Sequence, residues 1–189
     1  MAQQLGTSWA TLGNLESYSF YSDGLPFDFE YAIDGYYEKI SNTTVRIHLR
    51  AWIKANTGYS WTDANKSWRI WCTDGASFDT SSQNDSAYID SNGHHLPNDN
   101  GVSFDITQSG YFSGATFNVH FNYEIPYASQ DHTLDRSVSI RTSGIYVPYN
   151  TKSKSPIKAF APVQGKSKEA LKIYRGDANN KSKIIYTKG

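Results

Sequence analysis

Five aromatic side chains between positions 52 and 71 are the groups of this sequence best suited to contact a ligand. They are Trp52, Tyr59, Trp61, Trp68 and Trp71. Such rings offer rigid, amphipathic contact area on which sugars stack and protein partners pack. Trp52 falls on the polar side of an alternating segment, and Trp68 and Trp71 point to opposite faces of a regular strand. Ordinary packing beneath a loop is the first interpretation of these residues; as a binding site they would take a protein partner or, as a further alternative, a glycan.

Residues 90–101 combine many oxygen-bearing side chains with the adjacent histidines His94 and His95. A calcium site needs about six to eight oxygen ligands. The spacing of an EF-hand loop fails, because Leu96 stands where the first ligand before Gly101 would have to be. Adjacent histidines on a strand point to opposite sides, which is poor geometry for zinc. We therefore expect a polar loop here, no metal site and no cofactor.

Catalytic motifs are absent from the sequence. It has no Gly-x-Ser-x-Gly, no His-Glu-x-x-His and no P-loop. The many carboxylates of the first 150 residues include no pair whose spacing marks a glycosidase site. The single cysteine, Cys72, is expected to be a buried structural thiol. The sequence therefore predicts a protein without enzymatic activity.

Alternation of apolar and polar residues places most of the chain in β-strands. The clearest case is 45–54, where every second residue from Val45 to Ile53 is apolar, which marks a half-buried strand. Shorter segments of this kind, separated by turn residues, are 27–34, 68–72, 102–106, 117–125, 137–141 and 145–147. No segment has the apolar period of a long helix. The sequence predicts an all-β protein, an antiparallel β-sandwich or a jelly roll.

Charge divides the chain into two parts, although its formal net charge is zero. From Thr151 onward there are ten Lys and Arg against two Asp and Glu, a net charge of +8, which leaves −8 for residues 1–150. Residues 151–158 are rich in Lys, Ser and Pro, the composition of a linker. We expect a β-sandwich body over 1–150, a linker over 151–158 and a basic C-terminal extension over 159–189.

The C-terminal extension contains a degenerate repeat. Gly165-Lys166-Ser167-Lys168 precedes one group of apolar residues, and Asn180-Lys181-Ser182-Lys183 precedes a second. A small-polar turn before an apolar pair predicts a short strand. Because two such units cannot build a core, we expect them to anchor the chain to its own body, to another copy or to a different protein. The anchoring residues would be Leu171, Ile173, Tyr174, Ile184, Ile185 and Tyr186.

These repeats, at Val163–Lys168 and Asn179–Lys183, resemble short tail repeats of structural proteins from phages that infect Gram-positive bacteria. Segments 42–49 and 131–140 of the body are similar to β-rich minor structural proteins of such phages. The resemblance implies a virion structural protein, displayed on the capsid or tail as a decoration, a head fibre or an adhesin. It implies no catalytic residue.

The partners that this resemblance implies are other virion proteins and further copies of the chain, with host cell-wall glycan as a candidate ligand. The alternative is a carbohydrate-binding module of a cell-surface-binding protein. The N-terminus lacks the features of a secretion signal, and no apolar run is long enough to span a membrane. We therefore expect a virion protein made in the host cytoplasm, with no membrane partner. The lysines of the extension are point charges and not base-reading arginines, so we expect no nucleic-acid partner.

Overall fold

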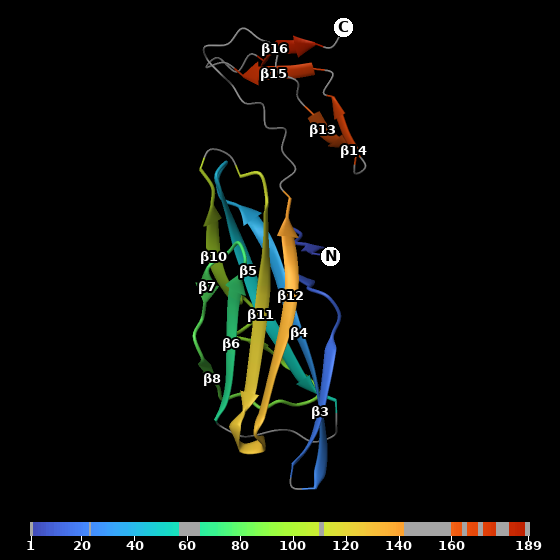
Figure 1. Cartoon of the computed structure of the whole chain (residues 1–189), viewed down its shortest axis with the longest axis vertical. Helices are drawn as coiled ribbons and strands as arrows, with labels where there is room; N and C mark the ends of the chain where they lie inside the picture. The colour runs from blue at the N-terminus through green and yellow to red at the C-terminus, as the bar shows by residue number, and fades with distance from the viewer. Residues whose placement is uncertain are drawn as a thin grey trace. The chain divides into compact units, whose positions relative to one another are not determined.

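The computed structural model (Figure 1) describes residues 2–22, 24–56, 65–109 and 112–141, and four strand segments, 160–163, 166–169, 172–176 and 182–187. The chain divides into two compact units, Met1–Arg141 and Thr142–Gly189. We call the first unit the body and the second the C-terminal unit. The predicted boundary at 150, the linker at 151–158 and the strand at 145–147 lie outside the described residues.

Two sheets form the body, and Figure 1 shows their long strands lying across one another. Sheet I has the strand order β1-β12-β11-β6-β7, and β8 pairs with β6 as well. Its strands are β1 (Gln3–Gln4), β6 (Lys66–Thr73), β7 (Phe78–Asp79), β8 (Gln83–Asp85), β11 (Ala115–Ile125) and β12 (Gln130–Ile140). A single 3-10 turn, η1 (Pro126–Ala128), joins β11 to β12.

Sheet II has the order β10-β5-β4-β2, with β3 also paired to β4 and β9 to β5. Its strands are β2 (Ala10–Thr11), β3 (Glu16–Ser22), β4 (Leu25–Lys39), β5 (Thr44–Ala55), β9 (His94–Leu96) and β10 (Val102–Thr107). Apart from the parallel pair β1–β12, the strands pair antiparallel. The predicted all-β sandwich is confirmed. Within the described ranges, no helix is long and apolar enough to cross a membrane.

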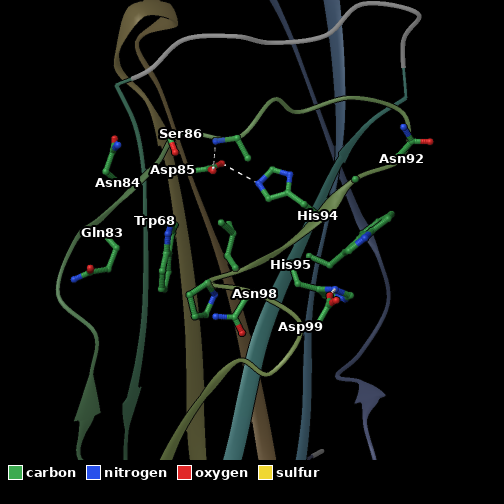
Figure 2. Close-up of a pocket in the computed structure, with 15 residues that line it drawn as sticks. Trp68, Gln83, Asn84, Asp85, Ser86, Asn92, His94, His95, Asn98 and Asp99 are labelled. Carbon is green, nitrogen blue, oxygen red and sulfur yellow. Dashed lines mark hydrogen bonds and ion pairs between the residues drawn. The ribbon is translucent and has the colours of Figure 1, made fainter.

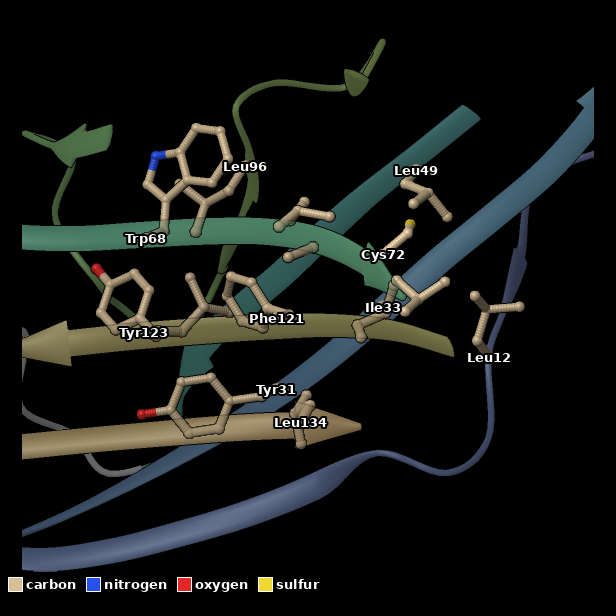
Figure 3. Packing of buried hydrophobic residues seen from close by; sticks show 14 of the residues in the cluster. Leu12, Tyr31, Ile33, Leu49, Trp68, Cys72, Leu96, Phe121, Tyr123 and Leu134 are labelled. Atoms are coloured by element: carbon tan, nitrogen blue, oxygen red, sulfur yellow. The ribbon is translucent and has the colours of Figure 1, made fainter. Parts of the chain in front are cut away.

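The core lies between the two sheets and follows the predicted alternation. In β5, every second side chain from Val45 to Ile53 has no exposed surface, while the residues between them are half-buried on the outer face. Figure 3 shows Ile33 and Leu49 of sheet II facing Trp68, Phe121 and Leu134 of sheet I; all five are buried. Removal of this apolar surface from water is the main force that holds the sheets together.

The N-terminal arm ties the two sheets together at one edge. β1 pairs with β12 of sheet I, whereas β2 pairs with β4 of sheet II. Arg136 of β12 holds the arm by donating hydrogen bonds to the carbonyl oxygens of Leu12 and Asn14 and to Glu16 Oε1, at 2.7–2.9 Å. The bond to the Leu12 carbonyl holds this part of the arm in place, and the Leu12 side chain is buried in the core.

The prediction of a polar loop over 90–101 is wrong in its centre, where His94–Leu96 form β9. This short strand pairs with Ala51–Ile53, beyond the part of β5 that pairs with β10. Leu96 is 3% exposed, so one apolar residue and three backbone pairings hold the segment in the sheet. Such a short segment has no periodicity that a sequence could display.

Among its described residues, the C-terminal unit contains two antiparallel strand pairs. β13 (Phe160–Val163) pairs with β14 (Lys166–Glu169), and β15 (Lys172–Gly176) pairs with β16 (Ser182–Thr187). Of the predicted anchoring residues, Ile173 and Tyr174 lie in β15, and Ile184, Ile185 and Tyr186 lie in β16. Leu171 lies outside the described residues.

Candidate functional site

A polar pocket of about 800 Å³ opens at the edge of the sandwich where β8 of sheet I approaches β9 of sheet II (Figure 2). Its walls come from 83–87, 92–99 and two tryptophans, Trp52 of β5 and Trp68 of β6. Both β8 and β9 are three-residue strands added to longer ones, so the pocket exists only because each sheet gains a short strand at this edge.

Asp85 is the buried polar centre of the pocket. Its carboxylate accepts hydrogen bonds from the Tyr123 hydroxyl, from His94 Nε2 at 3.1 Å and from the backbone N–H of Ala87 at 3.0 Å. The side chain lies opposite Lys66, and both residues are buried. Burial pushes the pKa of Asp85 up, but the bonds from His94, Tyr123 and Ala87 outweigh it, so the pKa lies below its ordinary value. Asp85 is therefore a carboxylate at neutral pH.

The bond between Asp85 and His94 joins the two sheets across the pocket, as Figure 2 shows. It has the form of an Asp–His dyad, which in hydrolases serves a nucleophile at the second imidazole nitrogen. His94 Nδ1 is buried and has no hydrogen-bond partner among the described residues. The pair links β8 to β9 and forms part of the wall of the pocket.

The other lining groups are suited to polyhydroxylated ligands. Amides and imidazoles can donate to or accept from hydroxyl groups, carboxylates accept from them, and indoles supply flat apolar area. The polar lining side chains are Gln83, Asn84, Asp85, Ser86, Asn92, His94, His95, Asn98 and Asp99. Among the lining residues that the structure describes there is no Lys or Arg, although Lys66 is buried opposite Asp85 and Lys54 lies beside the Trp52 ring. The described lining therefore presents carboxylates and other hydrogen-bonding groups but no basic side chain of its own.

The aromatic residues that the sequence suggests as a binding site lie in different places in the structure. Trp52 faces outward from β5 at the pocket, and the ammonium of Lys54 lies 5.5 Å from its ring centre. Trp68 is 5% exposed and belongs to the core, with part of its surface at the pocket wall (Figure 3). Trp71 faces the outer side of sheet I, stacked on His120 at 5.0 Å. Tyr59 and Trp61 lie outside the described residues.

Trp68 and Trp71 thus point to opposite faces of β6, as their spacing predicts. Of the three nominated aromatic residues that the structure describes, Trp52 and Trp68 come together at the pocket. Sequence reasoning missed Asp85, and it considered Asn98 and Asp99 only as metal ligands within 90–101. The one signal that could have found them is the density of Asn, Asp and His in 83–101.

Cys72 is buried in the core, and burial raises the pKa of its thiol to about 12. A thiol of that pKa is protonated at neutral pH and is a poor nucleophile. Across 2–22, 24–56, 65–109 and 112–141, no group of three or more His, Cys, Asp or Glu side chains is placed to hold a metal ion.

Comparison with family models, with curated proteins and with solved structures finds no match for this chain.

Proposed function

We propose that the body is a non-catalytic recognition domain that binds a saccharide in the pocket between β8 and β9. The observation that carries the proposal is the position of the Trp52 indole beside a dense set of amide, carboxylate and imidazole groups in one pocket. Its volume of about 800 Å³ lies in the range of about 300–1,000 Å³ typical of ligand sites. A sugar ring can stack its C–H face on the indole while its hydroxyls bond to Asn98 and Asp99.

The charge of the pocket favours a neutral saccharide. Asp85 is ionised at neutral pH, Asp99 adds a second carboxyl group, and the walls that the structure describes contain no Lys or Arg. A sugar acid or a phosphate-bearing polymer would meet the like charge of these two carboxylates. The nearby cations are already placed against protein groups, since Lys66 is buried opposite Asp85 and Lys54 lies beside the Trp52 ring. The ligand class is therefore a neutral glycan.

The phage resemblance of the C-terminal repeats supports display of this domain on a virion, as a decoration, fibre or adhesin, with a host cell-wall glycan as the ligand. The C-terminal unit is the anchor in this proposal. Two-stranded hairpins such as β13–β14 and β15–β16 are marginal on their own and gain stability by packing on a partner. The opposite net charges of residues 1–150 and 151–189 favour docking on another copy or on another virion protein.

A glycan array probed with the full-length chain tests the saccharide site, and Trp71→Ala is a matched control for Trp52→Ala. Both indoles are half-buried on an outer face and lie beside a cation, Lys54 or Arg69, but only Trp52 lines the pocket. Loss of the stacking ring should weaken binding about tenfold or more in Trp52→Ala, while Trp71→Ala binds as the wild type does.

The proposal is wrong if the wild-type chain binds no neutral glycan. It is also wrong if Trp71→Ala loses binding and Trp52→Ala keeps it. Hydrolysis of a bound glycan by the wild-type chain would overturn the non-catalytic part alone.

A further inference from the structure

The pocket continues onto the outer face of sheet II. His95 lies opposite Trp52 in the β5–β9 register, so its side chain shares the outer face with the indole. His95 Nδ1 lies 2.7 Å from Asp99 Oδ1, and His95 Nε2 lies 3.7 Å from Asp34 Oδ2 of β4. His95 and Asp99 line the pocket, whereas Asp34 lies on β4 and is not among the lining residues. His95 therefore connects the pocket to the outer face.

Arg50 extends this contact along β5. Its Nε donates to Asp34 Oδ2 at 3.1 Å, and its Nη1 donates to the carbonyl oxygen of Asp99 at 2.8 Å. Arg50 and Asp34 side chains are 16% and 13% exposed, so the ion pair is held flat against the sheet. Arg50 is two positions from Trp52 on the same strand and on the same face.

A second indole, that of Trp9, lies next to Arg50. The guanidinium carbon of Arg50 is 4.4 Å from the ring centre of Trp9. The Trp9 ring also meets Tyr36 edge-on at 4.7 Å, and Tyr36 stacks on His48 at 4.3 Å. Next to Trp9, β2 pairs with β4, and Thr11 Oγ1 donates to Asp34 Oδ1 at 2.9 Å. These contacts hold the indole in one orientation before a ligand binds. A ligand that stacks on it therefore has little side-chain entropy to remove.

We call this set of side chains the outer row; its members are Trp52, His95, Asp34, Arg50, Trp9 and Tyr36. Residues two apart on a strand are about 7 Å apart, so the indoles at its two ends are separated by a length on the order of 10 Å. A few linked sugar residues cover such a span. The polar groups of the row already have partners, since Arg50 bonds to Asp34 within the row and His95 bonds to Asp99 of the pocket wall. The row therefore has the same preference for a neutral ligand as the pocket.

We propose that the ligand is a neutral polysaccharide chain, which enters the pocket at Trp52 and runs along the outer row to a second stacking platform at Trp9. This inference rests on the saccharide site proposed above and adds its extent. Trp9 is a specificity-determining residue in this arrangement, because it distinguishes long chains from short ones and contributes nothing to a disaccharide held in the pocket.

Titration calorimetry with length series of neutral homo-oligosaccharides tests the inference. The probes are glucose, galactose, mannose and N-acetylglucosamine oligomers of increasing length, starting from disaccharides. For the series that binds, the wild-type Kd should fall about tenfold as the chain grows past the pocket and then level off. Trp9→Ala should abolish this gain while leaving the Kd of the disaccharide unchanged, and Trp52→Ala should weaken every length.

Trp9→Phe keeps a ring over Arg50 and should retain part of the gain, which guards against a folding defect in Trp9→Ala. A wild-type Kd that does not depend on length overturns the outer row and leaves the pocket standing. Equal weakening of short and long oligomers by Trp9→Ala also overturns it. If no neutral oligomer binds at all, the saccharide site itself is refuted and the outer row with it.

Discussion

Replacement of Asp85 by asparagine tests whether the buried carboxylate holds the pocket edge together. The amide side chain would keep the shape of the carboxylate and remove its charge. The carboxylate accepts three hydrogen bonds, from Tyr123, His94 and the Ala87 N–H. A hydrogen bond to a charged group stabilises a fold by about 1 kcal/mol more than a neutral one. Burial of the charge offsets part of that sum, so we expect Asp85→Asn to lower the free energy of unfolding by about 1–2 kcal/mol.

This loss should depend on pH in a defined direction. The pKa of Asp85 in the folded protein lies below its ordinary value of 3.8. A carboxyl group whose pKa is lowered on folding stabilises the fold above the unfolded pKa, and that stabilisation disappears as the pH falls through the folded pKa. The difference in stability between wild type and Asp85→Asn should therefore be full at pH 7 and shrink below pH 3.8.

Thermal and urea unfolding from pH 7 to pH 3 measure the effect, which corresponds to a fall in Tm of about 5 °C for a domain of this size at neutral pH. A double-mutant cycle with Tyr123→Phe isolates the bond between the two side chains, and we expect a coupling energy of about 1 kcal/mol. The reasoning is refuted if Asp85→Asn is as stable as the wild type at pH 7. It is also refuted if the stability difference stays constant down to pH 3.

Three further outcomes follow from the fold. Gly101→Ala should lower the free energy of unfolding by about 3 kcal/mol, because the φ of Gly101 is +68° and an added Cβ would lie 2.2 Å from the Leu49 carbonyl oxygen. Gly24→Ala, where φ is +77° but an added Cβ meets open space, should lower it by only about 1 kcal/mol in the same urea assay. Cys72, with a thiol pKa of about 12, should react with a disulfide reagent at pH 8 only when the protein is unfolded by denaturant, and rapid labelling of the native chain would contradict its burial. Deletion of 159–189 should leave the Tm of the body unchanged and convert any oligomer seen by light scattering to monomer; an oligomer that survives the deletion would contradict the anchor.

The fold could be predicted because its long strands carry their own pattern. In β5 the apolar residues alternate over the whole length of the strand, so the sequence alone determines which side faces the core. The same pattern placed Trp52 on the outer face, where it lies. Local periodicity was therefore enough to predict the all-β fold and the outward orientation of Trp52.

The pocket could not be predicted, because it depends on pairings between segments that are distant in the sequence or too short to show a period. Asp85 enters the site through three-residue pairing of β8 with β6, and Tyr123 reaches it from β11. Neither residue carries a local signal that distinguishes it from any other Asp or Tyr. Trp68, nominated as a contact residue, lies mostly in the core because Lys66, Trp68 and Ile70 all take the inner side of β6.

The two adjacent histidines show how one rule has two consequences. Neighbouring residues on a strand point to opposite faces, which argued against a shared zinc ion at His94 and His95. In β9 the same alternation sends His94 inward to Asp85 of the other sheet, at 3.1 Å, and His95 outward toward Asp34 and Asp99. A strand of three residues thus supplies two side chains with different partners. His94 bonds to Asp85 across the pocket, and His95 links the pocket to the outer row. The position of β9 on β5 is therefore what makes the pocket and the outer face of sheet II one continuous surface.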